Sequence, residues 1–246
     1  MAGCDKRFIA RLDGRELKSF TRLRLHAAER MSLYPPLHRL TLDGLSESER
    51  VLLLCGRKIS VALQAEYESV IAEGIVTDVI DDRAGGRGQT TVLFSPAPGF
   101  GAARVSLLLP AGIDYGEAVR RVCAASSVPV SANARSDMLL AKERPVYGNT
   151  ADVLCGLCAE AGLVPFLSGG AVHAVKAVPE RVSLFPAPGE LYDACVIGRD
   201  MITVYAAPKG YPAGGALLYE GRPRRVLRVR TEADTAGETV CELTLR

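Results

Sequence analysis

Apolar and polar residues alternate through much of the first hundred residues, which is the pattern of strands with one buried face. In residues 20–27, Leu23 and Leu25 fall on one side and Arg22 and Arg24 on the other. Residues 46–50 predict one helical turn, and a glycine within 66–81 predicts a bulge or bend. Further short strands are predicted at residues 6–12, 37–42, 51–55, 58–65, 66–81 and 89–95.

A helical period replaces the alternation in residues 144–178, which predict a strand, a helix, a strand and a closing hairpin. Asn149 or Thr150 can cap the helix, and Gly162 stands where helices commonly end. The apolar face of this helix is predicted to comprise Ala151, Leu154, Cys155 and Cys158, widened by Leu157.

An earlier stretch, residues 105–132, has the same predicted order of strand, short helix and strand. Shifting it by 35 residues places Cys123 on Cys158 and Val119 on Leu154. The match is explained equally well by duplication and by the general similarity of short strand–helix–strand units.

The order of these patterns predicts a mostly β, α+β fold with two β-barrel or tube-like domains and a middle section of small strand–helix–strand units. Proline- and glycine-rich stretches at 95–101 and 185–189 mark the boundaries. The predicted division is therefore an N-terminal β domain over 1–100, a middle section over 101–180 and a C-terminal β domain over 181–246.

Composition and net charge argue against some classes of function. The chain of 246 residues is 48% hydrophobic and 24% charged, as expected for a globular protein, and its formal net charge is +2. This balance gives no general attraction to nucleic acid or anionic membrane. The sequence contains no run of about 18 or more apolar residues, so it predicts no membrane span. The charged N-terminal stretch does not resemble a signal peptide.

Residues that could carry catalysis are scattered. Cys155 and Cys158 form a CxxC pair, but both are predicted to lie mid-helix, so core packing is the favoured interpretation over a redox or metal site. The three histidines stand singly, and the glycines at 85–88 precede no helix that could complete a phosphate site. We therefore predict no catalytic, metal or cofactor site.

The strongest charge feature is the run RPRRVLRVR at 222–230. Strict alternation would place Arg224, Arg228 and Arg230 on one face of a strand. The face could simply be solvated, or it could contact an acidic partner or a neighbouring subunit. For the second case we consider Asp78, Asp81 and Asp82 as the acidic counterparts.

Four stretches, taken in order, resemble a known family: 20–42, 73–95 with its glycine-rich tip, 146–167, and the closing hairpin 224–246. The chain resembles bacteriophage tail and baseplate hub proteins, namely the late control protein D group and the hub part of type VI secretion spike proteins. Each stretch alone is a weak signal.

The resemblance implies a structural virion protein without enzymatic activity. In that family two tube-like barrels per subunit assemble into a homotrimeric ring that joins the tail tube protein to the tail spike or tip protein. It implies a place in the phage tail, assembled in the host cytoplasm, with no membrane and no specific nucleic-acid partner.

Two other functions are kept open. A small cysteine-dependent hydrolase would use Cys155 or Cys158 with a lowered thiol pKa near His173. A ring-forming module of a secretion channel would also contain small α/β units like these, but it would be exported.

Overall fold

A computed structural model of the chain describes residues 7–64, 68–82, 88–131, 134–177, 183–184, 201–204, 212–219, 221–237 and 239–246. Residues 83–87, which are most of the glycine-rich tip predicted within 73–95, and the predicted boundary at 185–189 lie outside these residues. Among the described residues, no helix is both long and apolar enough to cross a membrane.

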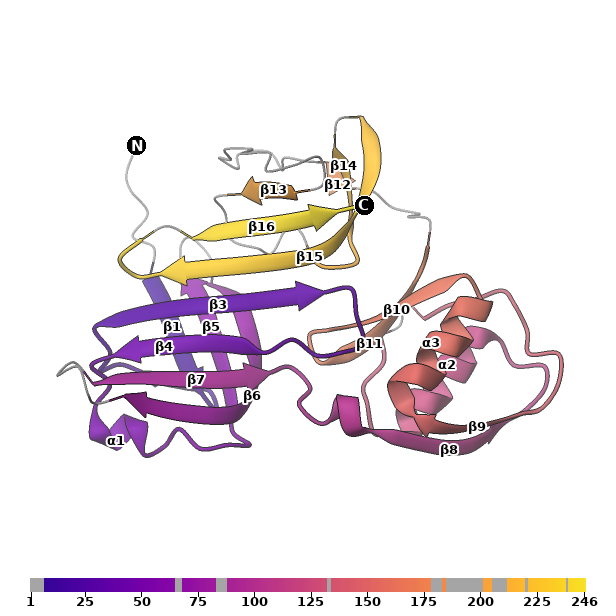
Figure 1. Cartoon of the computed structure of the whole chain (residues 1–246), viewed down its shortest axis with the longest axis horizontal. Helices are drawn as coiled ribbons and strands as arrows, with labels where there is room; N and C mark the ends of the chain where they lie inside the picture. Colours follow the sequence, from indigo (N-terminus) through magenta and orange to yellow (C-terminus); the bar gives the residue numbers. More distant parts are fainter. Residues whose placement is uncertain are drawn as a thin grey trace.

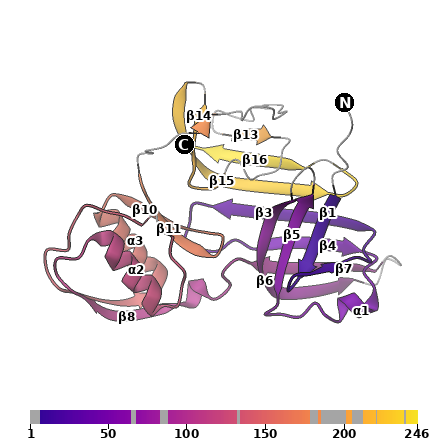
Figure 2. The same ribbon diagram turned by 180° about the vertical axis from the view of Figure 1, so that it is seen from behind.

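A large, mostly antiparallel sheet contains strands from both ends of the chain (Figures 1 and 2). The main path of this sheet runs in the order β12 (Ser183–Leu184), β14 (Ala216–Tyr219), β15 (Arg222–Asp234), β3 (Arg22–Arg30), β4 (His38–Asp43), β7 (Gln89–Ser95), β6 (Glu68–Asp82), β5 (Lys58–Gln64), β1 (Arg7–Leu12) and β2 (Arg15–Leu17). Off this path, β16 (Val240–Leu245) pairs with β15, and β13 (Met201–Val204) pairs with β16. Among these described strands, β12 and β14 form the one parallel pair.

The predicted alternation in β3 is confirmed. Leu23 and Leu25 are fully buried, whereas Arg22 is exposed and Arg24 half-buried. The buried faces of β3, β4, β5 and β7 enclose one apolar cluster, to which β15 contributes Ala233. The side chains between these buried positions point to the outward face of the sheet.

The predicted strand at 51–55 is wrong. Ser46 caps a single helical turn, α1 (Glu47–Arg50), by accepting the backbone N–H of Glu49. The chain then continues in turns because Leu53 N–H bonds locally to the carbonyl of Arg50, and Val51 stays 62% exposed. The apolar run thus supplies an edge loop rather than a strand.

At Gly74, where a bulge or bend is predicted, the backbone of β6 passes close to that of Ser95, and a bulge follows. A β-carbon on Gly74 would lie 2.5 Å from the carbonyl oxygen of Ser95, so only glycine fits there. Two residues later, the pairing of β6 with β7 shifts register between Val76 and Asp78. This lets one long strand pair first with β5 and then with β7.

The middle section holds its own apolar core. It comprises β8 (Arg104–Leu109), α2 (Tyr115–Ala125), β9 (Arg144–Asn149), α3 (Thr150–Glu160), β10 (Leu163–Ser168) and β11 (Ala171–Lys176), preceded by a short turn of 3-10 helix, η1 (Phe100–Ala102). β8 pairs with β9, and β10 with β11, both antiparallel. The strand expected after α2 is reduced to one parallel bridge between Val130 and Val172.

Helix α3 begins and ends where predicted. The side chain of Asn149 accepts the backbone N–H of Ala151, and Gly162 has φ +65° just beyond the last turn. One predicted core position is wrong, because Cys155 is exposed, whereas Leu157, predicted to widen the apolar face, is fully buried. Cys158 and the matching Cys123 of α2 are both fully buried.

The β10–β11 hairpin joins the middle section to the large sheet, and it lies between them in Figure 1. The N–H of Leu167 donates to the carbonyl of Ser32, and Arg225 donates to the carbonyls of Lys176 and Gly214. A β-carbon on Gly214 would lie 2.3 Å from the ring of Phe166, so the two residues pack closely. The three-part division and the two-barrel arrangement remain predictions. Outside the middle section, the described strands belong to one sheet, whose main path runs from β12 to β2.

Candidate subunit-contact surface

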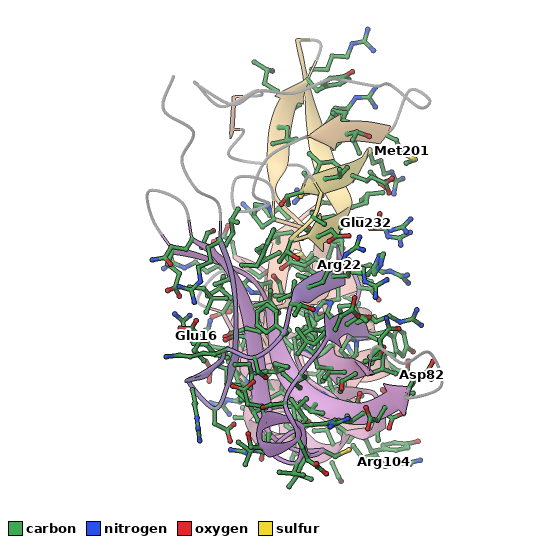
Figure 3. The ribbon with its side chains drawn as sticks, turned by 90° about the vertical axis from the view of Figure 1, so that its left-hand side faces the viewer. Glu16, Arg22, Asp82, Arg104, Met201 and Glu232 are labelled. Atoms are coloured by element: carbon green, nitrogen blue, oxygen red, sulfur yellow. The ribbon has the colours of Figure 1, made fainter. Side chains whose placement is uncertain are left out.

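The outward face of the large sheet carries charged side chains from five strands, β16, β15, β3, β4 and β6, with the uncharged β7 between β4 and β6. Figure 3 shows three of them, Arg22, Asp82 and Glu232, projecting toward the same side. The outward positions hold six arginines and six acids: Arg22, Arg24, Arg30, Arg39, Arg228 and Arg230, with Asp43, Asp78, Asp82, Glu232, Asp234 and Glu242.

Half of these arginines are paired within the chain. Arg22 contacts Asp234 at 2.6 Å, and Arg24 contacts Asp43 at 3.0 Å. The hydrogen bonds from Arg22 lower the pKa of the Asp234 carboxyl below its usual range. These pairs are partly exposed, so each contributes little to stability, but they fix the charges on this face.

Arg230 belongs to the same paired set. It contacts Glu232 at 2.5 Å on its own strand and Glu242 at 3.7 Å on β16. A residue that is already neutralised within its own subunit is a weaker candidate for an intersubunit contact.

Arg228 differs from Arg230. It lies directly opposite Arg30 across the β15–β3 pair, so two like charges face each other. Its Nε is buried and has no hydrogen-bond partner, and neither arginine has an acidic partner among the residues that the structure describes. Arg30 was absent from the sequence prediction, although continuing the β3 alternation by two more steps would have reached it.

The expectation that Arg224 shares a face with Arg228 and Arg230 is not met. The pairing of β15 with β16 shifts register between Val226 and Arg228, and both Val226 and Val229 are buried. This bulge reverses the alternation, so Arg224 lies on the side of Val226. Whether any of the three arginines forms a subunit contact remains a prediction.

The three acids considered as counterparts differ in their contacts. Asp81 contacts Arg50 at 3.3 Å and accepts a hydrogen bond from Thr90, so its carboxylate is already paired within its own subunit. Asp78 is exposed, and its Oδ1 accepts the adjacent backbone N–H of Val79 at 2.8 Å. Asp78 and Asp82 both face outward on β6.

The cysteine–histidine arrangement lacks the features of a nucleophilic site. Burial raises the pKa of Cys158 to about 12, and burial, with Asp152 nearby, raises that of Cys155. His173 stacks on Phe166, and neither Cys155 nor Cys158 has it as a hydrogen-bond partner in the described part of the chain. A catalytic thiol needs a lowered pKa, so this geometry does not support the hydrolase hypothesis.

We expect Cys155 to react with maleimide in the native protein and Cys158 to react only after unfolding, because the first is exposed and the second is buried. Cys155→Ala should leave stability nearly unchanged, whereas Cys158→Ala should cost about 1–2 kcal/mol. Peptide mapping of the labelled protein and urea unfolding of the two variants measure these effects. Equal labelling rates would contradict the burial of Cys158.

A cavity of about 330 Å³ lies where β3, β4, β6 and β15 meet the β10–β11 hairpin. Two of its polar side chains already bond to the backbone: Glu29 accepts from Ala213, and the Nδ1 of His38 accepts from Ala28. Burial raises the pKa of Glu29 and lowers that of His38 to about 4. Within the described residues, no group of three or more His, Cys, Asp or Glu could hold a metal ion.

No family model and no curated protein matches the sequence. The fold, however, matches solved structures over nearly the whole chain. The 43 kDa tail protein of prophage MuSo2 from Shewanella oneidensis has 8% sequence identity and a TM-score of 0.66, with 98% of this chain and 97% of that chain covered. This chain has the fold of phage tail proteins.

Two further solved structures are similar to this chain. A tail protein from Neisseria meningitidis MC58 has 11% identity and a TM-score of 0.63, covering 98% of this chain and 96% of its own. A type VI secretion component of E. coli, described as similar to the T4 tail proteins gp27 and gp5, has 10% identity and a TM-score of 0.61, with coverages of 96% and 76%. The resemblance found in the sequence is thereby confirmed at the level of the fold.

Proposed function

We propose that this chain is a structural component of a phage tail, the baseplate hub, which forms a homotrimeric ring and joins the tail tube protein to the spike or tip protein. The observation that carries the proposal is the match of tail-protein structures along almost their entire length as well as along almost all of this chain. The location that follows is the virion.

Two features of the chain support a structural role. The middle section and the large sheet are joined by backbone hydrogen bonds and by the Arg225 contacts, which suits a rigid part of an assembly. The outward face carries equal numbers of arginines and acids, which suits contacts with other protein subunits. The type VI secretion component among the similar structures supports a spike-type partner.

Native mass spectrometry of the purified chain tests the ring. The expected result is a species of three copies, each of 26.2 kDa. Electron microscopy of assembled particles labelled with an antibody against the chain tests its position in the tail. The label is expected where the tail tube meets the tip. A stable dimer in the particle, or label along the tube, would contradict the hub proposal.

A further inference from the structure

The internal ion pairs leave charges of opposite sign at two separate places on the outward face, called here the basic end, at β15 and β3, and the acidic end, at β6. At one end, Arg228 and Arg30 face each other across β15 and β3 without an acid among the described residues. At the other end, Asp78 is exposed on β6 and makes no ion pair with the described residues. The strand order places β3, β4 and β7 between β15 and β6.

The separation prevents one subunit from neutralising both ends. Adjacent strands lie about 4.8 Å apart, so the four steps from β15 to β6 span roughly 19 Å along the sheet. An arginine side chain cannot cross that distance. The two sets of charges therefore cannot neutralise each other within one subunit, and each is available to a neighbouring copy.

The local structure at the basic end favours a carboxylate ligand. The β15 bulge turns Arg228 outward beside Arg30, and the Nε of Arg228 is buried without an acceptor. Two guanidinium groups set side by side repel each other, and a carboxylate between them relieves the repulsion through bidentate hydrogen bonds.

The acidic end can supply that ligand. One carboxylate oxygen of Asp78 holds the backbone N–H of Val79, which leaves the second oxygen for a partner. Beside it on the same face of β6, Ile80 is 50% exposed and offers apolar area to an incoming surface.

We propose that Arg228 and Arg30 of one subunit bind Asp78 of a second copy of this chain, so that the basic end of one outward face meets the acidic end of the next. The contact is head-to-tail, and contacts of this type form a ring when the rotation from copy to copy closes. The inference rests on the proposed ring and names its contact. A nucleic-acid ligand is disfavoured because the same face carries as many acids as arginines.

The test is a set of charge reversals. Arg30→Glu with Arg228→Glu keeps two like charges opposite each other, so the monomer keeps the same local repulsion while the sign of the contact changes. We expect this double variant to raise the dissociation constant of the trimer at least tenfold in low salt, measured by sedimentation. Asp78→Arg alone is expected to weaken the trimer to a similar extent. The triple variant, which combines Arg30→Glu, Arg228→Glu and Asp78→Arg, is expected to recover most of the lost trimer affinity.

The matched control is Arg104→Glu with Arg135→Glu, which changes the net charge equally at exposed positions of the middle section. This control should assemble as the wild type does. Circular dichroism melting checks that every variant is folded. A wild-type chain that stays monomeric would overturn the ring and the contact together. A trimeric wild type whose double reversal assembles normally, or whose triple variant is not rescued, would overturn only the contact.

Discussion

Leu154→Asp is expected to leave the protein insoluble or its middle section unfolded. Leu154 is fully buried in α3, within the apolar cluster that α2 and the two small sheets enclose. An unpaired carboxylate there costs several kcal/mol, which is comparable with the stability of a whole domain. The soluble fraction after expression and the near-ultraviolet circular dichroism spectrum measure the effect.

The neighbouring residue provides the control. Cys155 is exposed on the same helix, so Cys155→Asp introduces the same charge without burying it. We expect that variant to fold and to unfold at nearly the wild-type urea concentration. A soluble, folded Leu154→Asp variant would show that the buried face of α3 has been assigned to the wrong residues.

Gly116→Ala is expected to destabilise the chain by about 1–3 kcal/mol, the usual cost of overpacking. Gly116 lies in the first turn of α2, where an added β-carbon would be 2.4 Å from the carbonyl oxygen of Ala134. That carbonyl also accepts from Arg120 at 2.9 Å, so the segment cannot retreat without losing a bond. Urea unfolding followed by circular dichroism measures the change.

Gly156→Ala is the matched substitution in α3, and it should act in the opposite direction. Its β-carbon would meet nothing within 4 Å, so only the helix propensity changes. Replacing glycine by alanine inside a helix stabilises by up to about 1 kcal/mol. Equal effects of the two substitutions would contradict the tight packing of α2 on the segment at Ala134.

Local patterns were sufficient to predict much of the fold. The alternation in β3 and the Asn149 cap of α3 follow from short-range rules, and the structure confirms both. Residues 51–55, after α1, have the composition of a strand but form turns. Composition could not predict this, because it does not report which backbone partners are available. Cys155 was misplaced because it borders the buried stripe of α3, where an exposed position cannot be told from a buried one by period alone.

The contact surface was only partly predictable. Arg228 was identified from its place in a basic run, but the bulge after Val226 reverses the faces of β15, and no glycine or proline marks it in the sequence. The pairing with β3 brings Arg30 into the same cluster, and this contact joins residues about two hundred positions apart. Single-sequence patterns carry no information on such pairings.

That pairing also affects how the chain folds as it is synthesised. The side chains of Arg22 and Asp234 are bonded, yet 212 positions separate them. At the usual rates of translation, roughly 10–40 s pass between the appearance of the two residues. During this interval β3 has one unpaired edge, and such edges can pair with other chains.

The middle section is held mainly by contacts within its own 73 residues, from Arg104 to Lys176, so it can form while the ribosome is still adding β15. Chains that stop before β15 would leave that edge of β3 permanently unpaired. Premature termination between the middle section and β15 should therefore give aggregates rather than a shortened soluble protein.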